Sequence, residues 1–470
     1  MKRVHLIGIG GTAMATVAAM LRRRGMAVSG SDQRVYPPMS DFLAREGIAV
    51  LEGYDAAHVT SDVDLVVIGN AVSRGNPEVE EVLDRKLRYC SLPEVIRDQF
   101  LWGARSIVVA GTHGKTTTTA LLGWLLADAG RDPTVLVGGV TGNFESGYRM
   151  GGGRDFVIEG DEYDSAFFDK TAKFLKYLPD IVIVNNVEFD HADIYADLSE
   201  IRRAFMRLVQ LVPRSGNLVL AYDDESAREL ARGAPCPVET FGLSTGADWQ
   251  AADVVYSAAE TSFLVRRHGA PFERFTVPLV GEHNVRNALA AITVAMHLDL
   301  DPAAVQASLS RFAGVKRRLE LRGTVRGVAV YDDFAHHPTA VAETLRAVRR
   351  ARPGQRVVAV FEPRSATACR AVFEEAFASA LAEADAVLVA PVYRRDLPDD
   401  RRLSEKRLVS AIRGRGTKAD APGSIDAILE RLIRDSEAGD LVVIMSNGGF
   451  ENIHARLLAA LGNSAREGSA

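Results

Sequence analysis

The stretch SIVVAGTHGKTTT at residues 106–118 places a short β-branched run directly before a glycine-rich loop and the start of a helical pattern. Such glycines let successive backbone N–H groups turn inward around a phosphate, and the helix N-terminus adds a partial positive charge. Lys115 is placed to reach the β- and γ-phosphates, and the Thr116 hydroxyl to ligate magnesium. The loop is shorter than the usual GxxxxGK[ST] pattern, because Val109 stands where that pattern has glycine. The residues expected to bind a nucleoside triphosphate here are Gly111, Thr112, His113, Gly114, Lys115, Thr116 and Thr117.

Similar β-branched runs recur along the chain, and each is followed by a polar or glycine-rich turn and then by a helical pattern. We expect strands at residues 3–7, 64–68, 106–109, 155–158, 180–184, 327–330, 356–360, 386–389 and 440–444. Their apolar residues are continuous rather than alternating, which is typical of parallel strands covered by helices on both faces. The predicted fold class is therefore α/β, with ligands at the carboxyl ends of the strands.

The length of the chain, 470 residues, corresponds to about three domains. Turn residues and new strand starts predict breaks near residue 104 and near residue 316. The expected domains are residues 1–104, 105–316 and 317–470.

Composition excludes several classes of protein. The 56 basic and 61 acidic residues give a net charge of −5, so we expect no nucleic-acid or membrane-surface partner, and no obligate protein partner is evident. The three cysteines form no CxxC pair, which favours a reducing compartment. No apolar run reaches the roughly 18 residues that span a bilayer. The sequence therefore predicts a cytoplasmic protein.

A second glycine loop, GIGGTA at residues 8–13, follows the first predicted strand and opens a helix. An acidic residue lies about twenty positions further on, as in dinucleotide-binding folds. This pattern predicts a diphosphate-bearing ligand, although close packing of helix on strand would also favour small residues here. The residues concerned are Gly8, Gly10, Gly11, Thr12, Ser31 and Asp32.

Acidic residues follow two strands near the phosphate loop. Glu159 ends one predicted strand, and His191 lies in the segment NVEFDH that follows the next. Magnesium beside a triphosphate needs hard oxygen ligands on rigid supports, so Glu159 is a candidate ligand, and His191 is a less typical one. Helix capping by the acid and simple surface exposure of the histidine are the alternatives.

Three further segments carry polar residues that the fold alone does not require. Asn284 and Asn287 share one face of a predicted helix, where their amides can read adenine or merely cap and pack. The segment GVKRRLE at residues 314–320 offers a cation for the triphosphate, or a solvated basic linker. The segment YDDFAHHP at residues 331–338 gathers two acids and two histidines at the end of a strand.

Taken in order, these motifs resemble those of the Mur ligases. The shared segments are AGTHGKTTTT, EGDEYD, NxExDH, GEHNVRNALAA, GVKRRLE and YDDFAHHPT, together with the N-terminal glycine loop, and they span residues 4 to about 340. Within the family the chain looks most like ligases that attach a tripeptide to UDP-N-acetylmuramate. That narrower resemblance rests on GDEYDSAFFDK at residues 160–170, on Lys173 and Phe174, and on FEPRS at residues 361–365. The branch that adds L-alanine typically reads EADESD and FQPH at the first and last of these places.

The resemblance implies an N-terminal Rossmann-like domain for UDP-N-acetylmuramate, a central P-loop ATPase domain, and a C-terminal Rossmann-like domain that closes over ATP and the amine. It implies an ATP-dependent ligase that joins UDP-N-acetylmuramate to L-alanyl-γ-D-glutamyl-meso-diaminopimelate, the murein tripeptide, in peptidoglycan recycling. ATP is the co-substrate, and two Mg²⁺ ions are expected, held by Thr116 and Glu159 and by His191. The remaining implied contacts are UDP at Gly8, Gly10, Gly11, Ser31 and Asp32, adenine at His283, Asn284 and Asn287, ribose at Asp333, and the triphosphate at Arg317 or Arg318. His337 and Arg364 are the candidates for the peptide, and Arg364 has a structural alternative, an ion pair with Glu362.

One departure from many Mur ligases can be read directly from the chain. No lysine occurs between Tyr177 and Val315, so no carbamoylated lysine can bridge the metals in that segment. The alternatives to the tripeptide reaction are ligation of L-alanine in peptidoglycan biosynthesis, a nucleotide-switched binding protein, and an NAD(P)-dependent oxidoreductase resting on the N-terminal loop alone. The ligase hypothesis implies no NAD.

Overall fold

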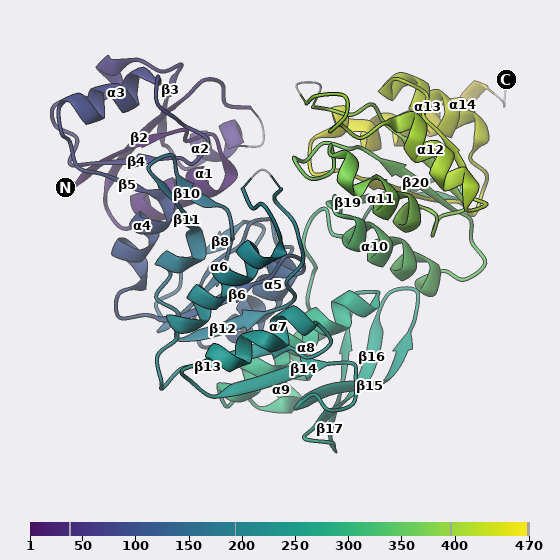
Figure 1. The fold of residues 1–470 in the computed structure, drawn as a ribbon, viewed down its shortest axis with the longest axis horizontal. Coiled ribbons are helices and arrows are strands. Elements are labelled where there is room, and N and C mark those ends of the chain that lie inside the picture. The colour runs from purple at the N-terminus through teal and green to yellow at the C-terminus, as the bar shows by residue number, and fades with distance from the viewer. Residues whose placement is uncertain (37–38, 193, 395–396, 468–470) are drawn as a thin grey trace. The chain divides into compact units, whose positions relative to one another are not determined.

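The computed structural model describes residues 1–36, 39–192, 194–394 and 397–467 (Figure 1). The chain forms two compact units. The first unit comprises Met1–Glu188, Ser199–Gly242 and Ala290–Ser308, and the second comprises Phe189–Leu198, Leu243–Leu289 and Leu309–Ala470. Among the described residues, no helix combines the length and the apolar character needed to cross a bilayer.

The N-terminal part of the first unit is a five-stranded parallel sheet with the order β3-β2-β1-β4-β5. Its strands are β1 Arg3–Ile7, β2 Ala27–Asp32, β3 Ala49–Glu52, β4 Leu65–Ile68 and β5 Tyr89–Ser91. The accompanying helices are α1 Thr12–Arg23, α2 Met39–Arg45, α3 Pro77–Asp84 and α4 Leu92–Ile96, with the short turns η1 Ala56–His58 and η2 Arg97–Leu101. Chain order reverses between β1 and β4, and such a switch point is where open α/β sheets bind ligands.

The second sheet of this unit has the order β14-β13-β12-β6-β9-β7-β8, and only the β7–β8 pair is antiparallel. Its strands are β6 Arg105–Ala110, β7 Thr134–Leu136, β8 Tyr148–Arg149, β9 Asp155–Glu159, β12 Ile181–Val184, β13 Asn217–Ala221 and β14 Val238–Gly242, and a separate hairpin is formed by β10 Asp164–Ala166 and β11 Asp169–Ala172. The helices along this part of the chain are α5 Lys115–Asp128, η3 Lys173–Lys176, α6 Leu198–Gln210, α7 Glu225–Glu229, η4 Leu230–Gly233 and α9 Pro302–Leu309. Residues 282–289 of α8 Glu282–His297 belong to the second unit, and residues 290–297 belong to the first. The adjacent strands β12, β6 and β9 end together, so the segments that follow them meet at one edge.

The second unit contains an antiparallel meander and a six-stranded sheet. The meander is β15 Trp249–Tyr256, β16 Thr261–Arg267 and β17 Ala270–Val277. The sheet has the order β18-β19-β23-β20-β21-β22, with strands β18 Glu320–Val325, β19 Val328–Asp333, β20 Val357–Phe361, β21 Ala386–Val389, β22 Lys418–Asp420 and β23 Leu441–Met445. Its helices are α10 Pro338–Ala351, η5 Ala371–Phe373, α11 Glu374–Leu381, α12 Glu405–Gly414, α13 Ile425–Asp435, η6 Phe450–Asn452 and α14 Ile453–Glu467.

Both faces of the C-terminal sheet are buried, as continuous apolar strands require. Alternate residues of β20 belong to two different cores: Ala359 and Phe361 to one, and Val358 and Val360 to the other. Helices α10, α11 and α12 supply the first core, while α13 and α14 supply the second (Figure 1). This arrangement confirms the predicted α/β class.

All nine predicted strands are present, with ends that differ by at most a few residues. The meander β15–β17 was not predicted, because its strands alternate buried and exposed side chains and carry no continuous apolar run. The antiparallel edge strand β18 was also not predicted, because its residues are all partly or fully exposed and form no continuous apolar run.

Candidate active site

The loop between β6 and α5 has the backbone geometry expected of a phosphate cradle. Gly111 has φ of 132°, and a Cβ there would lie 3.0 Å from the backbone nitrogen of Asn185. Gly114 has φ of 80° and is the N-cap of α5. The loop is held by the strand end beyond β12, because the His113 N–H donates to the Asn186 side chain at 2.7 Å. Both glycines are therefore required by backbone shape.

Lys115, the first residue of α5, points back across this loop. Its ammonium donates to the Gly111 carbonyl at 2.8 Å and to the two carboxylate oxygens of Glu162 at 2.8 and 3.1 Å. Burial alone would lower the pKa of Lys115, but the negative charge of Glu162 and then of Asp161 raises it above its ordinary value. Lys115 is thus positively charged, and its ammonium group lies beside the glycine loop.

Thr116 and Glu159 are brought together at the adjacent strand end. The Thr116 hydroxyl donates to Glu159 Oε1 at 2.9 Å, and the Gly138 N–H donates to Oε2 at 2.7 Å. A hydroxyl and a carboxylate on rigid elements beside a phosphate loop form the kind of donor set that Mg²⁺ prefers. Thr112 and Thr117 are also buried in or next to the loop.

His191 lies in the second unit, and its backbone has a positive φ. Its φ is 53°, and its side chain is 9% exposed. The preceding Asp190 accepts a hydrogen bond from the His191 N–H and another from the Thr367 hydroxyl. Burial works against ionisation of Asp190, but the nearby charges of His191 and His337 hold its pKa well below the usual range. An ionised carboxylate therefore accompanies His191.

The second unit also gathers the residues expected at adenine and ribose. The Asn287 amide donates to the Asn284 side chain at 3.2 Å, which confirms that the two amides are neighbours on α8. Burial lowers the pKa of His283, whose Nδ1 has no hydrogen-bond partner among the described residues. Burial also raises the pKa of Asp333, although Arg318 opposes this shift with its positive charge.

Arg317 and Arg318 have different surroundings. The Arg317 guanidinium donates to the carbonyls of Ser446 and Gly448 at 2.6 and 2.7 Å, and it lies 3.4 Å from Asp332. Arg317 is therefore tied to its own domain. The positive charge of Arg318 instead acts on both Asp333 and His283.

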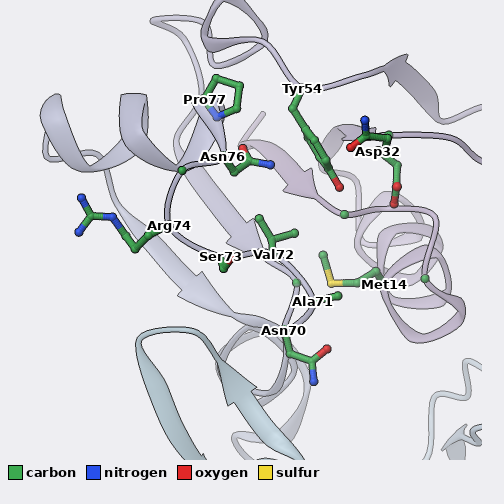
Figure 2. A pocket seen from close by; sticks show the side chains of 15 residues that line it. Met14, Asp32, Tyr54, Asn70, Ala71, Val72, Ser73, Arg74, Asn76 and Pro77 are labelled. Carbon is green, nitrogen blue, oxygen red and sulfur yellow. The ribbon is translucent and has the colours of Figure 1, made fainter. Parts of the chain in front are cut away.

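A cavity of about 520 Å³ opens at the switch point of the N-terminal sheet, between the carboxyl ends of β1 and β4 (Figure 2). Asp32 and Tyr54 lie on one side of it, and the segment from Asn70 to Asn76 lies on the other. The lining residues are Gly8, Gly11, Met14, Asp32, Gln33, Tyr54, Gly69, Asn70, Ala71, Val72, Ser73, Arg74, Gly75, Asn76 and Pro77. The Gly10 N–H donates to Asp32 at 2.8 Å, and a Cβ on Gly10 would lie 2.9 Å from the same carboxylate.

Three of the residues expected at this ligand, Gly10, Thr12 and Ser31, are not among those lining the cavity. Ser31 is fully buried, and its hydroxyl donates to Glu78. Its carbonyl accepts from the N–H groups of Gly8 and Ile9, so Ser31 holds the glycine loop. Thr12 is exposed at the start of α1.

The two peptide candidates both have partners within the second unit. His337 is the N-cap of α10, where Nδ1 accepts from the Thr339 N–H and Nε2 lies 3.2 Å from the Phe189 carbonyl. Arg364 stacks on Tyr393 at 3.9 Å and lies 3.6 Å from Glu362. The Arg364 side chain is 31% exposed, whereas His337 is buried.

The chain is similar to the members of one protein family over most of its length. Family models described as the Mur ligase catalytic, middle and glutamate ligase domains match residues 3–100, 109–295 and 317–448. UDP-N-acetylmuramate–L-alanyl-γ-D-glutamyl-meso-2,6-diaminoheptandioate ligase of Escherichia coli is 41% identical over 98% of this chain and 99% of its own length. The chain belongs to the Mur ligase family.

The chain is also similar to two further ligases. UDP-N-acetylmuramate–L-alanine ligase of Desulforapulum autotrophicum is 35% identical over 97% of this chain and 98% of its own. The crystal structure of a murein peptide ligase from Psychrobacter arcticus matches with a TM-score of 0.73 and 36% identity, over 98% of this chain and 99% of that one. The protein is thus an ATP-dependent, amide-forming ligase with the three-domain α/β architecture of its family.

Sequence reasoning missed several residues of this Mur ligase's site. Glu162 was visible as an acid in the EGDEYD run, yet its pairing with Lys115 depends on where the chain turns after β9. Tyr54 and the segment from Asn70 to Asn76 carry no motif of their own. Their only signal was their place, directly after strands β3 and β4 of a parallel sheet.

Proposed function

We propose that this Mur ligase joins the lactyl carboxylate of UDP-N-acetylmuramate to the L-alanine amine of L-alanyl-γ-D-glutamyl-meso-diaminopimelate, with ATP as co-substrate. The chemistry is supported by one arrangement, the cluster of Lys115, Thr116 and Glu159 around a loop whose two glycines have positive φ. The choice of tripeptide is supported by the greater identity to the tripeptide ligase than to L-alanine ligases. The domains proposed are residues 1–104, 105–316 and 317–470, which the three family matches support.

A carboxylate must be activated before an amine can displace its oxygen, and phosphorylation by ATP provides a good leaving group. In the proposed reaction a carboxylate oxygen attacks the γ-phosphorus, the bond to the bridging oxygen breaks, and ADP leaves. Lys115 turns from Glu162 to the phosphates and offsets the charge on their oxygens. The amine then attacks the carbonyl carbon of the acyl phosphate and loses a proton, and the carbon–oxygen bond breaks to release inorganic phosphate. Exclusion of water protects the activated acyl group from hydrolysis.

Thr116 and Glu159 are the proposed ligands of one Mg²⁺, and His191 of a second. The metal would neutralise phosphate charge and orient the transferred group. In the binding of ATP we assign His283, Asn284 and Asn287 to adenine and Asp333 to ribose. Arg318 is the better candidate for the triphosphate, because Arg317 already donates to two carbonyls of the C-terminal domain.

The N-terminal cavity is the proposed site of UDP-N-acetylmuramate. Gly8 and Gly11 present backbone at the switch point, and Asp32 orients the glycine loop through Gly10. For the peptide, Arg364 remains the candidate because a guanidinium binds carboxylates in a bidentate manner. His337 is the weaker choice, since both of its ring nitrogens already face backbone groups.

The test is phosphate release from ATP in the presence of UDP-N-acetylmuramate, measured with the tripeptide, with L-alanine and with no amine. The proposal predicts release with the tripeptide and little with L-alanine. Efficient use of L-alanine would instead assign the biosynthetic reaction. Release that does not depend on any amine would refute the ligase mechanism.

A further inference from the structure

Glu78, in the first turn of α3, has a fully buried carboxylate that accepts hydrogen bonds from three other segments. Its Oε2 accepts from the Ser31 hydroxyl at 2.5 Å and faces His5 Nε2 at 3.2 Å. Its Oε1 accepts from the Asp55 N–H at 3.3 Å and faces His58 Nδ1 at 2.8 Å. Because a carboxylate only accepts, both histidine nitrogens are assigned as donors.

The carboxylate at the centre of this cluster is ionised. Burial raises the pKa of Glu78, but the hydrogen bonds from His5, Ser31 and His58 outweigh burial and hold the pKa below its ordinary value. Removing one acceptor oxygen would leave the two donors that it serves without their acceptor, and unsatisfied buried donors are costly. The hydrogen bonds to Glu78 therefore hold each of these segments in place.

These segments are the ones that form the proposed nucleotide-sugar cavity. Three members of the cluster are immediate chain neighbours of cavity-lining residues: Ser31 of Asp32, Asp55 of Tyr54, and Glu78 of Pro77 (Figure 2). The Ser31 carbonyl also holds Gly8 and Ile9 through their N–H groups, at 2.8 and 3.0 Å. Glu78 itself is not among the residues that line the cavity.

We propose that Glu78 is a positioning residue, which sets the relative placement of the cavity's walls without contacting the ligand. The cluster joins the ends of β2 and β3 and the start of α3 through a single side chain. This inference rests on the proposed function, because it assigns that cavity to UDP-N-acetylmuramate. A buried ion is a poor device for stability alone, since apolar residues of similar volume often serve as well. A buried carboxylate that bonds several segments instead suits a site at which three segments must keep the same relative positions.

The experiment compares Glu78→Gln with the unmodified enzyme and with Glu81→Gln as the matched control. Glu81 lies on the same helix and pairs with Arg85 at the surface. Titration calorimetry measures the dissociation constants of UDP-N-acetylmuramate and of ATP separately, and steady-state kinetics measures both KM values and kcat. We expect Glu78→Gln to weaken the binding of UDP-N-acetylmuramate about tenfold or more, because the free energy needed to restore the cavity's geometry, of the order of one lost charge-assisted hydrogen bond, is then taken from binding.

In the same variant, ATP affinity and kcat at saturating UDP-N-acetylmuramate should stay within about threefold, because the phosphate loop lies on β6 and α5. Glu81→Gln should match the unmodified enzyme throughout. Equal weakening of both ligands, or a lower melting temperature with unchanged affinities, would show a purely structural role and overturn the proposal. If Glu78→Gln does not fold, Ser31→Ala carries the same test with the same expected split. An unmodified enzyme that binds ATP but no UDP-N-acetylmuramate would refute the proposed function itself.

Discussion

Replacing Lys115 with methionine should reduce both activity and stability, for reasons that the structure separates. The Glu162 carboxylate is 2% exposed and receives the lysine on both oxygens, while Lys115 itself is 11% exposed. Removing one partner of a buried ion pair costs about 3–5 kcal/mol. We therefore expect a loss of about 3–5 kcal/mol.

The double variant Lys115→Met/Glu162→Gln should recover about 2 kcal/mol or more, because the buried charge is gone. It should not recover turnover, since the charge that meets the phosphates is still absent, and the rate should fall about a hundredfold or more in both variants. Stability is measured without nucleotide, by amide hydrogen exchange of residues 105–128. Activity is measured by phosphate release with UDP-N-acetylmuramate, ATP and the tripeptide.

Two results would refute this reasoning. Wild-type protection from exchange in Lys115→Met would show that the ion pair contributes nothing to the local fold. A double variant as unstable as the single one would show that the loss comes from the lysine stem and not from the orphaned carboxylate.

The other predictions concern the dependence on magnesium, the binding of ATP, the binding of the peptide and the reactivity of the Cys90 thiol. Glu159→Gln should raise the magnesium concentration that gives the half-maximal rate, and an unchanged magnesium titration would make Glu159 a simple strand-end acid. Arg318→Ala should raise the KM for ATP about ten- to a hundredfold, whereas Arg317→Ala should mainly lower the melting temperature; the reverse pattern would exchange their roles. Arg364→Ala should raise the KM for the tripeptide much more than those for ATP and UDP-N-acetylmuramate, and equal rises would indicate general damage. Burial raises the pKa of Cys90 to about 12, so iodoacetamide at pH 8 should leave that thiol unmodified in the native protein, as read by mass spectrometry; rapid alkylation would contradict this.

The sequence by itself determined the class of fold and the position of the glycine loop for which we propose phosphate binding. Continuous apolar runs such as residues 106–109 require burial on both faces, and GTHGK at residues 111–115 requires a backbone that only glycine adopts easily. These are local properties, set by side-chain period and by φ. For the same reason the neighbouring placement of Asn284 and Asn287 could be predicted from helical spacing.

Only the tertiary structure decided which side chains meet across distant segments. Nothing local to residue 162 pairs it with Lys115, and nothing local to residue 78 brings it to Ser31. Likewise Arg317 and Arg318 are adjacent in sequence, yet one is tied to backbone carbonyls and the other acts on Asp333. Such pairings depend on strand order and on the path of each turn, which bring together residues 47 positions apart in both of the first two cases. The physical reason is that burial and hydrogen bonding of polar groups are properties of the assembled fold, whereas periodicity and backbone preference belong to the chain.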